Sequence, residues 1–90
     1  MIRYFVIVDG QVQGVGFRFF AQSCAIKHSL TGFVRNMDNG MVELEIQGAE
    51  ENVNKFLSTI RRGNTFIKVD DFSIKKIDII LGEKKFKVTY

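Results

Sequence analysis

The sequence predicts an α+β fold in which two helices pack on one face of a mostly antiparallel sheet. Strand-like and helix-like patterns follow one another in the order strand, helix, strand, strand, helix, strand, with a short last strand. The chain has 90 residues, and no proline, repeat or Ser/Gly-rich linker divides it. Its 46% hydrophobic and 26% charged residues are ordinary for a globular protein and exclude disorder. We therefore expect one domain over residues 1–90.

The first expected elements are a strand, a glycine-rich loop and a helix. Ile2–Val8 joins β-branched and aromatic residues with almost no polar interruption, which is typical of a covered strand, and we expect it to end at Asp9-Gly10. Glycines at positions 10, 14 and 16 then favour a loop with unusual backbone angles. A helix follows, because one apolar face recurs at helical spacing at Phe17, Phe20, Ala21 and Cys24.

The middle of the chain predicts a β-hairpin. Gly32–Asn36 forms its first strand, and the alternation of Val42, Leu44 and Ile46 with polar residues forms its second. Asp38-Asn39-Gly40 between them favours a tight two-residue turn, since Asn-Gly accepts the positive φ values that such turns require.

The last third predicts a helix and further strands. The second helix buries Val53, Phe56, Leu57 and Ile60, and Gly63 caps it. Residues 67–69 and 73–80 read as strand, and residues 86–90 as a final short strand. The order βαββαβ plus a short terminal strand is that of a ferredoxin-like split-βαβ sandwich. A chain of this size buries only about 60–65% of its unfolded surface, so we expect nearly all nine Phe in one core.

Composition excludes several classes of function. Cys24 is the only cysteine and His28 the only histidine, which excludes an internal disulfide, a cysteine zinc site and most metal or triad chemistry. We expect no metal and no cofactor, a buried Cys24, and a reducing, cytoplasmic location. No apolar run reaches the length of a signal-peptide core or a membrane span, so we expect no membrane partner.

The charge pattern and the glycine-rich loop favour an anionic ligand. The chain has a net charge of +3. Its first 36 residues carry four basic side chains and one acidic side chain, so this part of the chain is positively charged. The segment Gln13-Gly14-Val15-Gly16-Phe17-Arg18 runs directly into a helix, whose free N–H groups and dipole favour phosphate-like anions, and Arg18 adds a fork of charged donors. No Gly-Lys-Ser/Thr follows, as a nucleotide P-loop would require, so a small phosphate group fits better. The alternative is a structural turn that merely needs its glycines.

Two motifs resemble the signatures of the acylphosphatase family. Residues 10–18, GQVQGVGFR, resemble the first signature, and Gly32–Asn36 with Gly40, Val42 and Gly48 resembles the second. The resemblance covers essentially the whole chain. It implies an open sandwich of the kind described above, and an enzyme that hydrolyses carboxyl–phosphate anhydrides without metal, cofactor or covalent intermediate.

The resemblance also implies residue roles. Arg18 matches the phosphate-binding arginine and Asn36 the asparagine that positions the attacking water. The backbone amides that hold the phosphate oxygens are implied to be those of Gln13, Gly14, Val15, Gly16 and Phe17. These roles agree with phosphoryl transfer, in which positioning and electrostatic stabilisation do most of the catalysis. A small acyl phosphate is the implied substrate and inorganic phosphate the product, and we expect a monomer.

Three further residues, His28, Ser29 and Arg35, are expected to have structural and not catalytic roles. His28-Ser29 stands where many relatives carry Leu-Gly, so we expect Ser29 to take the left-handed conformation at a cost of about 1 kcal/mol. We expect His28 to be a solvated residue at a helix end. Arg35 should point to the opposite face of its strand from Asn36.

One alternative comes from a different class of protein. RNA-recognition domains share the βαββαβ order and use exposed strand aromatics, and Gly16–Phe20 faintly resembles their aromatic octapeptide. That motif belongs on the third strand, where this chain has Glu43 and Glu45, and negative charge repels phosphates. We therefore expect no nucleic-acid partner. RNA binding, or a non-catalytic regulatory module of the same topology, remains the alternative to catalysis.

Overall fold

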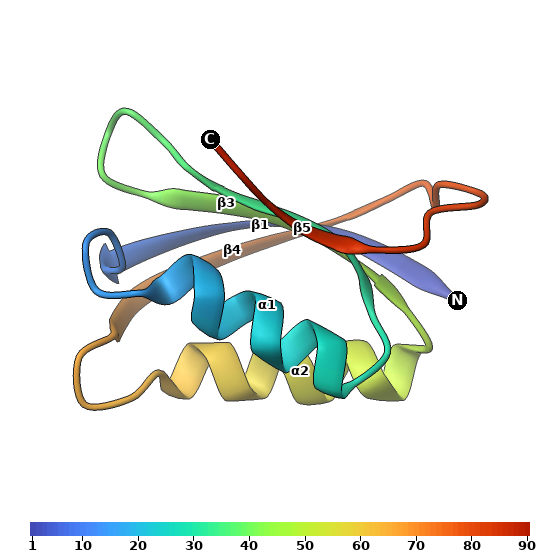
Figure 1. Ribbon diagram of the computed structural model, residues 1–90, viewed down its shortest axis with the longest axis horizontal. Coiled ribbons are helices and arrows are strands. Elements are labelled where there is room, and N and C mark those ends of the chain that lie inside the picture. The colour runs from blue at the N-terminus through green and yellow to red at the C-terminus, as the bar shows by residue number, and fades with distance from the viewer.

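Two helices cover one face of a five-stranded sheet in the computed structural model, which describes residues 1–90 (Figure 1). The elements are β1 (Ile2–Gln11), α1 (Phe17–Lys27), β2 (Thr31–Asn36), β3 (Val42–Gly48), α2 (Glu50–Arg62), β4 (Lys68–Ile77) and β5 (Phe86–Thr89). This confirms the predicted α+β, ferredoxin-like sandwich. No helix in the structure is both long enough and apolar enough to cross a membrane.

The sheet order is β4-β1-β3-β2-β5. Every neighbouring pair is antiparallel except β2 and β5, which run parallel, so the expected mostly antiparallel sheet is confirmed. β4 and β5 are the two edges. Their exposed lysines, Lys75, Lys76 and Lys87, discourage pairing with a further strand.

Strand β1 is longer than the sequence predicts. We expected its end at Asp9-Gly10, but Gly10 and Gln11 continue the pairing with β4, opposite Val69 and Lys68. The register shifts between Asp9 and Gly10, which is a β-bulge: the glycine bends the strand without ending it. At the other end of this pair β4 stops at Ile77, so residues 78–80 lie outside the strand that we expected there.

The β2–β3 hairpin is confirmed, but its turn is not the expected two-residue turn. The Met37 N–H donates to the Met41 carbonyl at 2.9 Å, and the Gly40 N–H donates to the Met37 carbonyl at 3.2 Å. Gly40 has a φ of 90°, whereas Asn39 has no positive φ. The loop therefore has three residues, with the glycine alone in the left-handed position. The Asn39 side chain accepts a hydrogen bond from the Met41 N–H at 3.0 Å, which holds this longer turn.

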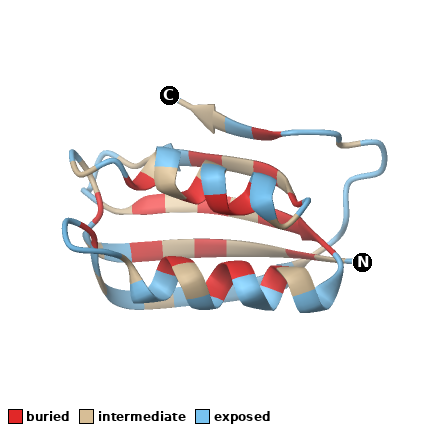
Figure 2. Cartoon of the chain, turned by 60° about the horizontal axis from the view of Figure 1, so that its bottom comes forward, coloured by how far each residue is buried: buried red, intermediate tan, exposed pale blue.

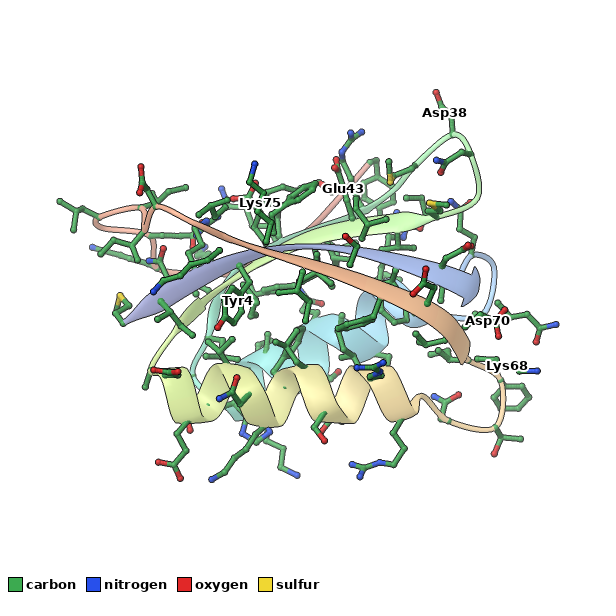
Figure 3. All side chains as sticks on the ribbon, turned by 180° about the vertical axis from the view of Figure 1, so that it is seen from behind. Tyr4, Asp38, Glu43, Lys68, Asp70 and Lys75 are labelled. Atoms are coloured by element: carbon green, nitrogen blue, oxygen red, sulfur yellow. The ribbon has the colours of Figure 1, made fainter.

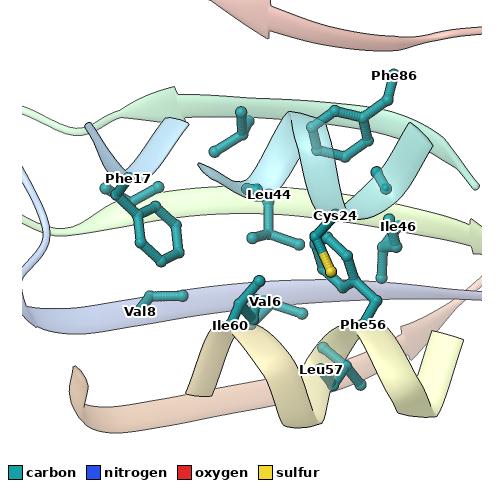
Figure 4. Close-up of a cluster of buried hydrophobic side chains, with 14 of the residues drawn as sticks. Val6, Val8, Phe17, Cys24, Leu44, Ile46, Phe56, Leu57, Ile60 and Phe86 are labelled. Atoms are coloured by element: carbon teal, nitrogen blue, oxygen red, sulfur yellow. The ribbon is translucent and has the colours of Figure 1, made fainter. Parts of the chain in front are cut away.

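The core lies between the sheet and the two helices, whose buried stripes face the strands (Figures 2 and 4). α1 buries Phe17, Ala21, Cys24 and Ala25, and α2 buries Val53, Phe56, Leu57 and Ile60. The predicted helical faces are therefore confirmed. Cys24 is only 7% exposed, and burial raises the pKa of its thiol, as expected for a small apolar core residue.

The expectation that nearly all Phe join this core is wrong. Those that are buried in it or packed against it are Phe17, Phe20, Phe56, Phe72 and Phe86. Phe19 and Phe66 are 57% and 73% exposed. Phe5 and Phe33 instead lie half-buried on the sheet face away from the helices, on either side of Glu45. Alternation along a strand sends every second side chain to that face, whatever its polarity.

The face of the sheet away from the helices carries a buried arginine. Arg3 is 1% exposed, and its guanidinium contacts Glu45 and Glu83, each at 2.8 Å. The Gln47 side chain donates to the Ile80 carbonyl at 2.9 Å and accepts from the Ile80 N–H at 2.8 Å. These contacts fasten the β4–β5 connection across one end of the face. Figure 3 shows the alternation: Glu43 and Lys75 stand on this face, whereas Tyr4 points towards α2.

Candidate active site

The β1–α1 loop and the β2–β3 hairpin lie at the same end of the sheet, at the left of Figure 1. Arg18 and Asn36 line one small cavity there, of about 150 Å³. Its other lining residues are Val12, Gly14, Gly16, Phe17 and Phe19. The structure thus brings together most of the residues that the sequence nominated. Gln13 and Val15 belong to the same loop but do not line the cavity.

Two glycines set the shape of the loop. Gly14 and Gly16 have φ values of 73° and 82°, in the left-handed region that disfavours other residues. A Cβ on either glycine would meet no atom within 4 Å, so backbone conformation and not space requires glycine here. Gly16 is also the N-cap of α1, and no side chain caps that end.

Because nothing caps α1, its first backbone donors are free. The first hydrogen bond of the helix runs from the Phe20 N–H to the Gly16 carbonyl at 3.0 Å. The N–H groups from Gly14 to Phe19 donate to no acceptor in the protein. They lie at the positive end of the helix dipole, and the first turn contains no acidic residue. This arrangement suits a tetrahedral anion.

Arg18 lies in the first turn of α1 and is half-buried. It takes part in none of the ion pairs of the protein, so its charge is available to a ligand. Its Nη1 donates to the Thr89 carbonyl at 3.3 Å, and its guanidinium carbon lies 4.6 Å from the centre of the Tyr90 ring. The residues at the end of β5 thus orient the guanidinium. No local pattern predicts this contact, because 71 positions separate the two hydrogen-bonded residues.

Asn36 is the last residue of β2 and faces the same cavity. Its Oδ1 is buried and has no hydrogen-bond partner in the protein. A buried polar atom without a partner costs about 1–3 kcal/mol, so such an atom in a cavity marks a place for a hydrogen-bonding ligand. Arg35 is exposed and pairs with Glu43 on the opposite face, as expected.

Gln13 has a role that the sequence did not reveal. We expected only its backbone amide to matter, but its side-chain Nε2 donates to the Met37 carbonyl at 2.7 Å and to the Met41 carbonyl at 2.8 Å. The side chain therefore joins the β1–α1 loop to Met37 and Met41, the two residues that flank the hairpin loop and that we call the neck of the hairpin. No feature of residues 10–18 alone could identify its two partners.

Comparison with known proteins identifies the family of this chain. The acylphosphatase family model matches residues 4–88. An acylphosphatase of Clostridium beijerinckii is 53% identical over 90 residues, with all of both chains covered. The crystal structure of the acylphosphatase from Bacillus subtilis matches with a TM-score of 0.94 and 41% identity, also over all of both chains. An acylphosphatase structure from Coxiella burnetii matches with a TM-score of 0.89 and 28% identity, over 98% of this chain and 92% of that chain. The chain therefore belongs to the acylphosphatase family, which is a family of enzymes.

Proposed function

We propose that this chain hydrolyses the carboxyl–phosphate bond of small acyl phosphates to a carboxylate and inorganic phosphate. The observation that supports the proposal most strongly is the set of unpaired donors at the cavity. These are the N–H groups from Gly14 to Phe19. The guanidinium of Arg18, which takes part in no ion pair, and the buried amide oxygen of Asn36 line the same space.

In the proposed reaction, each group acts on a different part of the substrate. Arg18 and the loop amides bind the phosphoryl oxygens and stabilise the charge that they carry in the loose transition state. The Asn36 Oδ1 accepts a hydrogen bond from water and aims its oxygen at phosphorus. The new P–O bond forms from that water as the bond to the carboxylate oxygen breaks.

The leaving group explains why the site needs no strong acid or base. The carboxylate departs with the bonding electron pair and is a weak base, so it requires no proton from a general acid. The proton of the attacking water passes to a phosphate oxygen. An arginine, a row of amides and one asparagine are therefore sufficient for the chemistry.

The proposal extends to location and partners. We place residues 1–90 in the cytoplasm as one monomeric, acylphosphatase-like domain that uses no metal or cofactor. The lone Cys24, buried in the core, supports a reducing compartment. The cavity of about 150 Å³ suits a phosphate group better than a nucleotide.

RNA binding is the less favoured alternative. Phe5 and Phe33 lie half-buried on the sheet face away from the helices, where RNA-recognition domains stack bases. Glu45 lies between them and pairs with Arg3, and Glu43 on the same strand pairs with Arg35. The two arginines of that face are therefore not free to bind phosphates. We propose no nucleic-acid partner.

The test is phosphate release from acetyl and benzoyl phosphate by the purified chain in EDTA. We expect full activity in EDTA, and a large loss of both binding and turnover in Arg18→Ala. Arg18→Lys should recover little, because one ammonium does not reproduce the guanidinium fork. Arg35→Ala is the matched control, since that arginine is exposed on the opposite face. No hydrolysis by the wild-type chain, or activity that requires added Mg²⁺ or Zn²⁺, would overturn the proposal.

A further inference from the structure

We infer that the Gln13 side chain is a positioning residue that holds the water-binding Asn36 in register with the phosphate-binding loop. The inference rests on the proposed function and adds a residue to it. It concerns the side-chain amide of Gln13, not its backbone N–H.

The Gln13 side chain bridges two residues of the hairpin, and we call this pair of hydrogen bonds the clamp. The two hydrogens of one amide nitrogen go to two carbonyls on opposite sides of the hairpin loop, at 2.7 Å on Met37 and 2.8 Å on Met41. Met41 accepts a second bond from the Met37 N–H at 2.9 Å. Gln13 thus closes the neck of the hairpin and fastens it to the β1–α1 loop at the same point.

These two bonds are the only hydrogen bonds in the structure between residues 12–16 and the hairpin. Beyond the neck, residues 38–40 are exposed and hold the hairpin to nothing else. Asn36 directly precedes Met37, one of the two clamped residues. Sheet pairing with Val42 holds the backbone of Asn36, and the Gln13 side chain adds the only hydrogen-bonded link from the phosphate-binding loop to this end of β2.

The chemistry of the contact requires a double donor at position 13. Both partners are carbonyl oxygens, which only accept, so an amide nitrogen matches them and a carboxylate repels them. A thioether of similar length fills the space but donates nothing. Because a displacement of about 1 Å at a reacting group can cost about 100-fold in rate, loss of the clamp should reduce kcat.

The experiment compares Gln13→Met and Gln13→Glu with Gln11→Met and Gln11→Glu. Gln11 is exposed two positions earlier and its side chain makes no hydrogen bond, so it controls for the change in charge and polarity. For Gln13→Met we expect a fall in kcat of about 10- to 100-fold, with the phosphate Kd within about two-fold of wild type. The Gln11 variants should match the wild-type chain in both measurements.

The pH profile gives a second signature. A protonated carboxyl can donate one hydrogen bond, so the kcat of Gln13→Glu should rise relative to wild type as the pH falls and the introduced carboxyl becomes neutral. Gln13→Met should show no such recovery. A merely structural role of Gln13 would not produce this difference between the two variants.

NMR of the Asn36 side-chain amide provides a readout that does not depend on turnover. Its signals should shift or broaden in Gln13→Met and stay in place in Gln11→Met. Wild-type kcat in Gln13→Met, parallel losses of kcat and phosphate binding, or an undisturbed Asn36 signal would each overturn the clamp. If the wild-type chain fails to hydrolyse acyl phosphates but the Asn36 signal responds as described, the proposed function fails and the clamp stands.

Discussion

The guanidinium of Arg18 lies over the ring of Tyr90, with its central carbon 4.6 Å from the ring centre, and its Nη1 donates to the neighbouring Thr89 carbonyl. Tyr90 is itself 87% exposed, so its ring serves the arginine more than the core. An exposed cation–π contact contributes about 0.5–1 kcal/mol. The end of β5 thereby helps to fix the phosphate-binding side chain.

Loss of the Tyr90 ring should weaken binding more than chemistry. We expect Tyr90→Ala to raise the phosphate Kd and the KM for benzoyl phosphate by about two- to five-fold, which corresponds to the energy of one exposed cation–π contact. Tyr90→Phe keeps the ring and should behave as wild type. Steady-state kinetics and phosphate titration measure both values, and equal behaviour of Tyr90→Ala and Tyr90→Phe would contradict the assignment.

Inorganic phosphate should stabilise the folded chain. The free N–H groups from Gly14 to Phe19 and the Arg18 guanidinium exist as a site only in the folded state, so a bound anion raises the free energy of unfolding. At 100 times its Kd, phosphate should add about 2.7 kcal/mol. Thermal melting measures the effect. Arg18→Ala should lose most of the shift, and an unchanged Tm in wild type at saturating phosphate would count against the anion site.

The residue after α1 should limit stability. Ser29 has a φ of 58°, the only positive φ of a non-glycine residue in the protein, which confirms the conformation expected from the sequence. Ser29→Gly should therefore raise the free energy of unfolding by about 1 kcal/mol. Ser23→Gly, at an exposed position inside α1, should lower it by about 0.5 kcal/mol. Urea denaturation of both variants is the check, and a destabilised Ser29→Gly would be the contrary result.

The Arg3–Glu83 contact predicts a pH-dependent contribution to stability. Burial alone would raise the pKa of Glu83, but hydrogen bonds from Arg3 and Thr31 and the charges of Arg3 and Lys87 outweigh it and hold that pKa below its ordinary value. The charged carboxylate therefore favours the folded state. Its contribution is complete above the pKa of the unfolded chain and disappears as the pH falls through the lower pKa of the folded chain.

Glu83→Gln measures that contribution. Near pH 7 the variant should be less stable than wild type by about 1.5–3 kcal/mol, the usual value of a hydrogen bond to a charged group. Below the folded pKa of Glu83 the two proteins should be equally stable. Glu51→Gln is the control, because Glu51 is 80% exposed and pairs only with Lys55 on the same helix. A stability difference that persists unchanged in acid would contradict the role of the Glu83 charge.

The sequence predicted those parts of the fold that local patterns determine. The apolar faces of α1 and α2, the alternation in β3 and the order of elements all follow from spacing along the chain. The predicted end of β1 at Asp9-Gly10 was wrong. A glycine can end a strand or bend it, and which of the two happens depends on pairing with the neighbouring strand. Phe5 and Phe33 were misassigned for a similar reason: hydrophobicity alone does not tell which face of a sheet a residue occupies.

The candidate site also has parts that local patterns predict and parts that they do not. The glycine loop, Arg18 and Asn36 could be nominated from two short motifs, and the structure brings them to one cavity. Their supports could not be predicted. Tyr90 reaches Arg18 from the far end of the chain, and Gln13 reaches the hairpin across 24 and 28 positions. Such contacts depend on how the sheet is assembled, which no local pattern specifies.

The central claim is that Asn36 holds the attacking water while other groups hold the phosphate. If so, Asn36→Ala should leave phosphate affinity nearly unchanged and reduce kcat by about 100- to 1000-fold, the usual effect of losing one well-placed polar group. Asn36→Asp should be no better, since a carboxylate beside an anionic substrate repels it. Asn54→Ala, on the exposed side of α2, is the matched control.

The most direct measurement is therefore the kcat of Asn36→Ala on benzoyl phosphate beside its Kd for inorganic phosphate, with folding checked by circular dichroism. The account predicts a kcat lowered by about 100-fold or more and a Kd close to that of wild type. A folded Asn36→Ala variant that keeps near-wild-type kcat would contradict it, and so would one whose phosphate affinity falls as far as its rate.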